Sequence, residues 1–101
     1  MELVVVDKGV TRTVLMAGEL RFSDHASVRN LIDDFEMPRY HSFEMSLKNL
    51  DFIDSAGLGM LMLMAEAAEK NGVKFQVMDA VGRVKKILDH ADANNMLNVI
   101  S

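Results

Sequence analysis

Ser55 stands between an aspartate and a run of small residues, in the stretch Asp54-Ser55-Ala56-Gly57-Leu58-Gly59. The apolar residues that follow predict a helix that begins here and ends near Asn71-Gly72, a typical C-terminal cap. Serine is a preferred N-cap because its hydroxyl accepts a hydrogen bond from a backbone N–H two or three residues later. The same N–H groups and the positive end of the helix dipole favour a phosphate. Ser55 is therefore expected to be either a plain helix cap or a phosphorylation site.

The predicted helix is apolar on more sides than one buried stripe needs. On a helical wheel, its core-facing stripe consists of Gly57, Met60, Leu61, Met64 and Ala68. Gly57 is expected to face the sheet, where no side chain fits. Gly59, Met62 and Leu63 lie on the side that becomes charged further along the helix. Apolar residues that cluster on an exposed side beside a helix N-terminus suggest a contact surface.

Other chemistry is poorly supported by the residue types and their spacing. His25, His41 and His90 lie in different segments, and the chain has no cysteine. The loop Gly57-Leu58-Gly59 lacks the lysine of a P-loop and the third glycine of a dinucleotide-binding fingerprint. Asp51 and Asp54 could bind a cation, but capping and solvation explain them as well. We therefore expect no metal, no cofactor and no catalytic residue.

Composition indicates one small soluble domain. The chain has 101 residues, of which 50% are hydrophobic and 26% charged, and its formal net charge is −4. An acidic chain without a Lys/Arg cluster argues against a nucleic-acid partner. The most apolar run, Ala56–Ala65, is about half of the roughly 20 residues that a membrane-spanning helix needs. With no signal-peptide pattern either, we expect a cytoplasmic protein that does not bind a membrane.

The rest of the chain has the pattern of alternating strands and helices. Strands are expected at Leu3–Asp7, Thr11–Gly18, Phe43–Leu47, Val73–Asp79 and Leu97–Ile100, the first two as a hairpin. One helix is expected to be capped by Ser23 and stopped by Pro38, with a stripe of Val28, Leu31, Ile32 and Phe35. Another is expected to be capped by Asp79, with a stripe of Val81, Val84, Ile87, Leu88 and Ala91. The order β-β-α-β-α-β-α-β predicts an α/β fold with a mixed, mostly parallel β-sheet.

The stretch Leu50–Leu61, LDFIDSAGLGML, resembles the phosphorylation loop of STAS domains, the family of bacterial anti-sigma factor antagonists. That loop follows an apolar strand, has the pattern Asp-Ser-Ser/Thr/Ala-Gly-Leu-Gly and leads into a helix. Gly18-Glu19-Leu20 is similar to the family's Gly-Glu-Leu-Asp stretch after the second strand. The expected element order also agrees. The resemblance covers nearly the whole chain and implies a single STAS domain over residues 1–101.

The resemblance implies a regulatory protein that is the substrate of an enzyme rather than an enzyme. An anti-sigma factor with a histidine-kinase-like ATPase fold would phosphorylate Ser55, and a PP2C-type phosphatase would reset the switch. The unphosphorylated chain would bind the anti-sigma factor and release its sigma factor, or control a biofilm or motility output. Asp54 would orient the Ser55 hydroxyl or assist the partner's active site. The surface for the partner would include Asp54, Ser55, Gly57, Leu58, Gly59, Met62, Gly18, Glu19, Leu20 and Arg21.

Two residues depart from the family's pattern. Arg21 stands where many members have aspartate. If it lies beside Ser55, it is expected to contact a phosphate or an acidic residue of the partner. Ala56 replaces the frequent serine or threonine, which makes Ser55 the single acceptor of the loop.

Two other functions remain open from the sequence. A STAS subunit of a lipid-transporting ABC complex would share the fold and bind its partners whatever the state of Ser55. A small-ligand or nucleotide-binding STAS domain would bind a nucleotide tightly on its own, although the chain has no phosphate cradle with a lysine. The intact Asp-Ser-Ala-Gly-Leu-Gly loop favours the switch.

Overall fold

A computed structural model describes residues 1–35, 40–93, 97 and 99–100. Its elements are β1 (Glu2–Lys8), β2 (Thr11–Leu20), the 3-10 turn η1 (Phe22–Asp24), α1 (His25–Asp34), β3 (Ser42–Ile53), α2 (Ser55–Lys70), β4 (Lys74–Met78), α3 (Gly82–His90) and β5 (Val99–Ile100). The expected alternation of strands and helices is confirmed, with η1 as an addition before α1. Among these residues no helix is long and apolar enough to cross a membrane.

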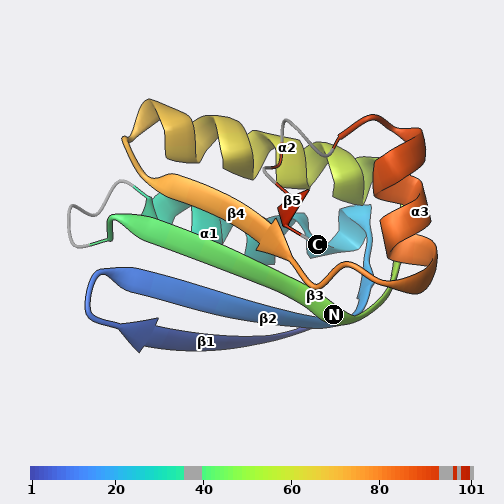
Figure 1. Ribbon diagram of the computed structural model, residues 1–101, viewed down its shortest axis with the longest axis horizontal. Helices are drawn as coiled ribbons and strands as arrows, with labels where there is room; N and C mark the ends of the chain where they lie inside the picture. The colour runs from blue at the N-terminus through green and yellow to red at the C-terminus, as the bar shows by residue number, and fades with distance from the viewer. Residues whose placement is uncertain (36–39, 94–96, 98, 101) are drawn as a thin grey trace.

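The strands form one sheet in the order β1-β2-β3-β4-β5 (Figure 1). β1 and β2 are an antiparallel hairpin, and its turn uses Gly9 at a φ of 58°. The other neighbouring strands are parallel, because a helix connects each strand to the next. The sheet is therefore mixed and mostly parallel, as the sequence predicts.

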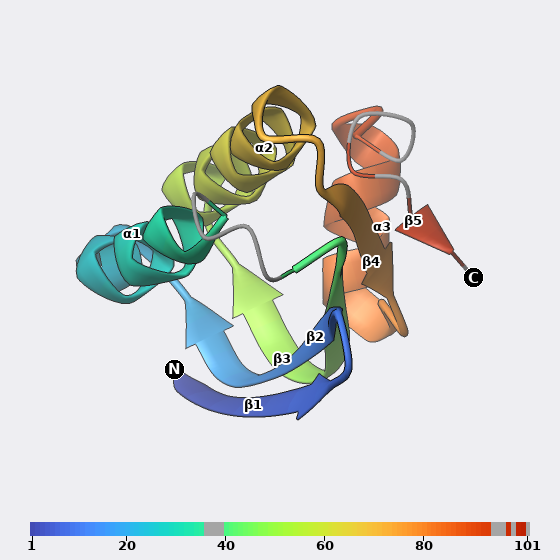
Figure 2. The same cartoon turned by 90° about the vertical axis from the view of Figure 1, so that its left-hand side faces the viewer.

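Helices α1 and α2 lie side by side over one face of the sheet, and α3 stands at the end where β3 leads into α2 (Figures 1 and 2). Alternate strand residues point toward the helices. The fully buried ones include Val14 and Met16 of β2 and Phe43, Met45 and Leu47 of β3. The expected core stripe of α2 is confirmed, since its buried residues are Gly57, Met60, Leu61, Met64 and Ala68.

Helix α1 differs from the sequence-based expectation at its start. Ser23 lies within η1, and Asp24 occupies the N-cap position. The η1 turn forms because the Arg21 N–H donates to the Asp24 carboxylate at 2.9 Å and the Asp24 N–H donates back to the Arg21 carbonyl. Helix α1 ends at Asp34, whereas the expected stop at Pro38 lies outside the described residues.

Helix α3 is shorter than its predicted stripe, and Asp79 does not cap it. Asp79 has a left-handed φ of 63° and accepts a hydrogen bond from the Ser46 hydroxyl at 2.9 Å. Helix α3 begins only at Gly82, so Val81 precedes it and Ala91 follows it, and both are exposed. Val84 and Leu88 are the residues that α3 buries in the core.

Strand lengths also depart from the predictions. β3 has 12 residues and continues through "KNLDFI" to Ile53, well beyond the expected end at Leu47. β4 is shorter and covers Lys74–Met78, while β5 contains only Val99–Ile100. The long β3 is what carries the chain to the end of the molecule where α2 begins.

Candidate functional site

Asp54 caps helix α2 and fixes where it starts. Its backbone is extended, and its Oδ1 accepts a hydrogen bond from the Gly57 N–H at 2.6 Å. The Leu58 N–H donates to the Asp54 carbonyl at 2.9 Å. The interpretation of Ser55 as the N-cap is therefore wrong: Ser55 is the first residue inside the helix. Both residue types cap well, and only the backbone conformation decides between adjacent candidates.

Asp54 also joins the start of α2 to the end of β2. Its N–H donates to the Leu20 carbonyl at 3.2 Å, and its Oδ2 accepts from the Phe22 N–H at 3.3 Å. These bonds bring the segment that follows Gly18 next to the Ser55 loop. In the described part of the chain, the carboxylate bonds to backbone N–H groups and not to the Ser55 hydroxyl, so it holds the loop rather than the hydroxyl.

Ser55 is exposed on the first turn of α2. Its hydroxyl makes no hydrogen bond to any residue that the structure describes. The Gly57 and Leu58 N–H groups of this turn already bond to Asp54, and the positive end of the helix dipole lies at the same place. A modifying enzyme can therefore reach this hydroxyl, and a phosphate added there would meet a favourable helix end.

The two glycines after Ser55 have different surroundings. A Cβ on Gly57 would lie 2.5 Å from the Leu20 carbonyl oxygen and 2.9 Å from Ile53 Cγ1, so no side chain fits there. A Cβ on Gly59 would have no atom within 4 Å. Gly57 and Leu20 are both buried, which corrects their expected place on the surface for a partner. Gly57 and Leu20 instead pack against each other beneath the Ser55 loop.

The other expected surface residues are accessible to different degrees. Glu19 and Arg21 are exposed, whereas Gly18 is half-buried and has a φ of 91°. Leu58 and Met62 are half-buried and pack against the core. Leu63 is 55% exposed, and its outward orientation follows the helical wheel.

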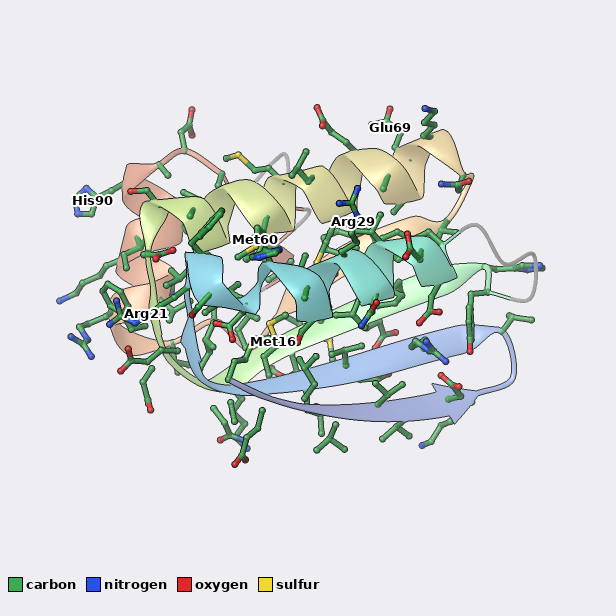
Figure 3. The ribbon with its side chains drawn as sticks, turned by 180° about the vertical axis from the view of Figure 1, so that it is seen from behind. Met16, Arg21, Arg29, Met60, Glu69 and His90 are labelled. Atoms are coloured by element: carbon green, nitrogen blue, oxygen red, sulfur yellow. The ribbon has the colours of Figure 1, made fainter. Side chains whose placement is uncertain are left out.

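A shallow hollow of about 550 Å³ opens beside Ser55, between the start of α2 and the end of α3. Its lining residues are Phe52, Ile53, Asp54, Ser55, Leu58, Ile87, His90 and Ala91. Figure 3 shows His90 and Arg21 at the same end of the molecule, with Glu69 at the far end of α2. Sequence alone does not place His90 here, because the crossover from β4 to α3 brings it to the loop.

Two arginines flank the ring of Phe52 next to the Ser55 loop. The Cζ atoms of Arg21 and Arg83 lie 4.8 Å and 5.5 Å from its centroid. Arg21 also forms an ion pair with Glu19, with 2.5 Å between Nη2 and Oε1. Phe52, which lines the hollow beside Ser55, thus has a guanidinium group from the residue that follows β2 and another from α3 close to its ring. Contact of Arg21 with a phosphate or a partner stays a prediction.

Phe22 is an exposed aromatic residue that sequence reasoning did not select. It is 66% exposed, and its ring centroid lies 5.2 Å from that of His25. Its backbone N–H bonds to Asp54, so the Phe22 backbone lies next to the residue that precedes Ser55. An aromatic residue directly after Gly-Glu-Leu-Arg was the available signal, since exposed aromatic residues are enriched in protein interfaces.

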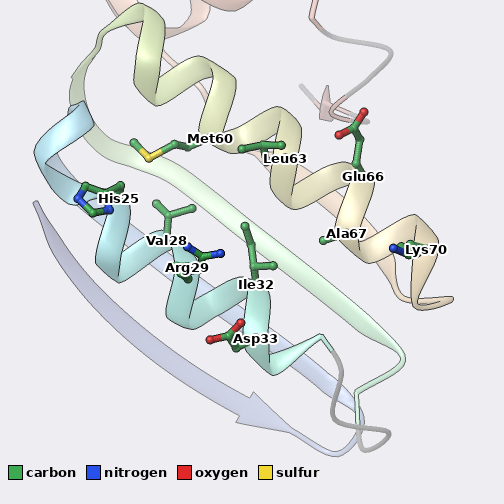
Figure 4. Close-up of a pocket in the computed structure, with 10 residues that line it drawn as sticks. All are labelled: His25, Val28, Arg29, Ile32, Asp33, Met60, Leu63, Glu66, Ala67 and Lys70. Carbon is green, nitrogen blue, oxygen red and sulfur yellow. The ribbon is translucent and has the colours of Figure 1, made fainter.

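A second hollow of about 550 Å³ lies between α1 and α2 (Figure 4). Val28, Ile32 and Met60 contribute apolar surface, and Leu63 adds an exposed side chain. The charged residues that line it are Arg29, Asp33, Glu66 and Lys70. Charges of both signs select no single class of ionic ligand. No cluster of three or more potential metal ligands occurs among the described residues.

The STAS domain model matches residues 3–101. The chain belongs to the STAS domain family. Its element order and the position of the Asp-Ser-Ala-Gly-Leu-Gly loop between β3 and α2 agree with the resemblance. None of the curated protein sequences matches the chain.

Solved structures share this STAS fold at low sequence identity. An anti-sigma factor antagonist from Mycobacterium paratuberculosis has a TM-score of 0.81 and 18% identity, over 97% of this chain and 83% of that one. The phosphorylated form of the Bacillus cell fate determinant SpoIIAA has a TM-score of 0.75 and 14% identity, over 99% and 92%. The murine Solute Carrier 26 family member A9 anion transporter has a TM-score of 0.76 and 17% identity, over 93% of this chain but only 16% of the transporter. Regulators and transporters thus share the fold.

Proposed function

We propose that this STAS domain is an anti-sigma factor antagonist that Ser55 phosphorylation switches off. The observation that carries the proposal is the exposed Ser55 hydroxyl, which has no hydrogen-bond partner in the described structure, on a loop that Asp54 holds in place. The unphosphorylated chain binds an anti-sigma factor that is also a serine kinase with a histidine-kinase-like ATPase fold. A PP2C-type phosphatase removes the phosphate and restores the form that binds. Phosphorylation, dephosphorylation and binding take place in the cytoplasm.

The surface for the partner surrounds Ser55. Gly59 and Leu58 lie on the helix side, Arg21 and Phe22 on the β2 side, and the α3 residues that line the hollow complete it. A standard interface covers about 800 Å² per partner, which a domain of this size can offer. Phe22 supplies an exposed aromatic side chain, a residue type that is enriched in protein interfaces.

Charge alone accounts for the switch. A phosphate adds roughly −1.5 to −2 charges at the centre of the surface, where binding would remove its water. Burying such an unpaired dianion costs several kcal/mol, and even about 3 kcal/mol weakens binding more than a hundredfold. The fold therefore need not change for the partner to leave.

The test is capture of partners from lysate of the native host with paired baits, Ser55→Ala and Ser55→Asp, read by mass spectrometry. We expect a kinase-like ATPase protein with the alanine bait and not with the aspartate bait. Because aspartate is an imperfect mimic, the phosphorylated protein serves as a third bait. Capture of the same proteins by all three baits, above all transporter subunits, would instead identify a constitutive binding subunit.

A further inference from the structure

β1 forms one edge of the sheet, and among the described strands it pairs only with β2 (Figure 1). Its centre consists of Val4, Val5 and Val6, which are 55%, 43% and 40% exposed. Natural proteins usually protect such an edge with a central charge, a proline or a bulge, because its free N–H and C=O groups can pair with another strand. The centre of β1 has no such protection, and its register with β2 is continuous over seven residues.

We propose that β1 pairs antiparallel with β1 of a second copy, so that the two sheets join around a two-fold axis. This inference is independent of the proposed function. In an antiparallel pair, opposite residues alternate between hydrogen-bonded and non-hydrogen-bonded pairs. Two-fold symmetry therefore requires that some residue faces its own copy. Val5 is the middle of the strand, and only pairing centred on it uses all seven residues.

Charge complementarity favours the register centred on Val5. In this register Glu2 faces the partner's Lys8, and Lys8 faces the partner's Glu2. An acid thus lies opposite a base at both ends of the paired strands. A shift of the centre to Val4 or Val6 would shorten the pairing and separate these charges. Leu3 faces the partner's Asp7, which already has Arg12 as its ion-pair partner at 2.8 Å.

The outer face of the sheet adds apolar contacts to this pairing. Side chains alternate along a strand, so Val4 and Val6 share the outer face with Glu2 and Lys8. The β1–β2 register places Val4 beside Leu15, which is 38% exposed, and Val6 beside Thr13. In the pair of copies, Val4 would lie beside the partner's Val6. Such β-branched cross-strand pairs stabilise a sheet.

The proposed pairing leaves the candidate site accessible. Figure 1 places β1 at the lower edge of the sheet and α2 on its opposite side. In Figure 2 helices α1 and α2 lie away from the outer side of β1 and β2. Ser55 of each copy would therefore remain free to meet a partner or an enzyme.

Analytical ultracentrifugation of the full chain tests the proposal. We expect concentration-dependent dimers that Val5→Lys abolishes, because it places two lysines across the axis. Leu63→Lys is the matched control, since it adds the same charge to an exposed apolar residue on α2. Circular dichroism establishes that both variants are folded.

Charge exchange tests the register without touching the apolar centre. Glu2→Lys and Lys8→Glu should each weaken the dimer about tenfold, because every end pair becomes repulsive. The double variant should restore wild-type association. An equimolar mixture of the two single variants should form mixed dimers, since each end then joins unlike charges.

Three results would overturn the proposal. The first is a wild-type chain that stays monomeric up to about 1 mM, where even contacts worth about 4 kcal/mol associate. The second is a dimer that Leu63→Lys abolishes and Val5→Lys does not, which would assign the contact to α2. The third is a double charge variant that associates no better than either single variant.

Discussion

Asp54 and Ser55 are adjacent residues with separate roles. Asp54 accepts hydrogen bonds from the Gly57 and Phe22 N–H groups, whereas the Ser55 hydroxyl forms no hydrogen bond in the described structure. We expect Asp54→Ala to lower the free energy of unfolding by about 1–2 kcal/mol, the usual cost of a lost N-cap. Ser55→Ala should change it by less than about 0.5 kcal/mol. Urea unfolding followed by circular dichroism measures both free energies. Equal losses in the two variants would mean that Ser55 also caps the helix.

Gly57 and Gly59 form a matched pair for testing how closely α2 approaches β2. The atom nearest to a Cβ on Gly57 belongs to the Leu20 backbone, which cannot turn away as a side chain does. Gly57→Ala should therefore cost about 1–3 kcal/mol by overpacking. Gly59→Ala has open space and should gain about 0.5–1 kcal/mol from reduced chain entropy. Comparison of the unfolding midpoints of the two variants tests this difference. A Gly57→Ala variant as stable as wild type would contradict the close contact between Gly57 and the Leu20 carbonyl.

At the scale of elements, local patterns predicted most of the fold. The hairpin and the core stripe of α2 follow from residue periodicity, and both are present. The caps at Ser23, Ser55 and Asp79 were wrong for a common reason. Beside Ser23 and Ser55 an aspartate occupies the N-cap position, and Asp79 bonds to a distant partner instead. Which residue caps a helix therefore depends on tertiary contacts. Asp79, for example, bonds to Ser46 on a neighbouring strand.

Arg12 ties the β1–β2 hairpin to the end of α1. Its guanidinium bonds to Asp7 at 2.8 Å and also to Asp34 and Tyr40, and its side chain is only 13% exposed. The hydrogen bond to Asp7 is the main reason that the pKa of Arg12 is raised, so the group stays charged. We expect Arg12→Ala to lower the free energy of unfolding by about 1–3 kcal/mol, as for hydrogen bonds between charged groups.

The control for Arg12 is Arg29, an exposed arginine on α1. Arg29→Ala should stay within about 0.5 kcal/mol of wild type in the same urea titration. Arg12→Lys should recover only part of the loss, because an ammonium cannot reach several acceptors with the planar geometry of a guanidinium. Equal losses of stability for Arg12→Ala and Arg29→Ala would mean that the bonds of Arg12 to Asp7, Asp34 and Tyr40 do not stabilise the contact between the hairpin and α1.

For the whole molecule, motifs in the sequence select only the middle of the candidate site, and the fold supplies the residues around it. Ser55 and the Gly18–Arg21 segment were recognisable from motifs, but Arg83 and His90 join them only through the fold. Burial of Leu20 and Gly57 likewise depends on how α2 meets β2. A motif can select a candidate residue such as Ser55 because the motif is local in sequence, whereas the surroundings of that residue are assembled from several elements.

Phosphorylation of Ser55 is expected to act locally and leave the fold unchanged. The phosphate would lie at an exposed helix start, where the dipole contributes about 0.3–1 kcal/mol and partly offsets repulsion from Asp54. The free energy of unfolding should therefore change by less than about 1 kcal/mol. Urea unfolding measures this free energy, and backbone amide NMR spectra of the chain with and without phosphoserine at position 55 show where the structure changes. Shifts should concentrate in the Ser55 loop, the Arg21 segment and the end of α3, while β1 stays unchanged. Shifts spread through the whole sheet would contradict the charge mechanism. They would mean that phosphorylation releases the partner by rearranging the core.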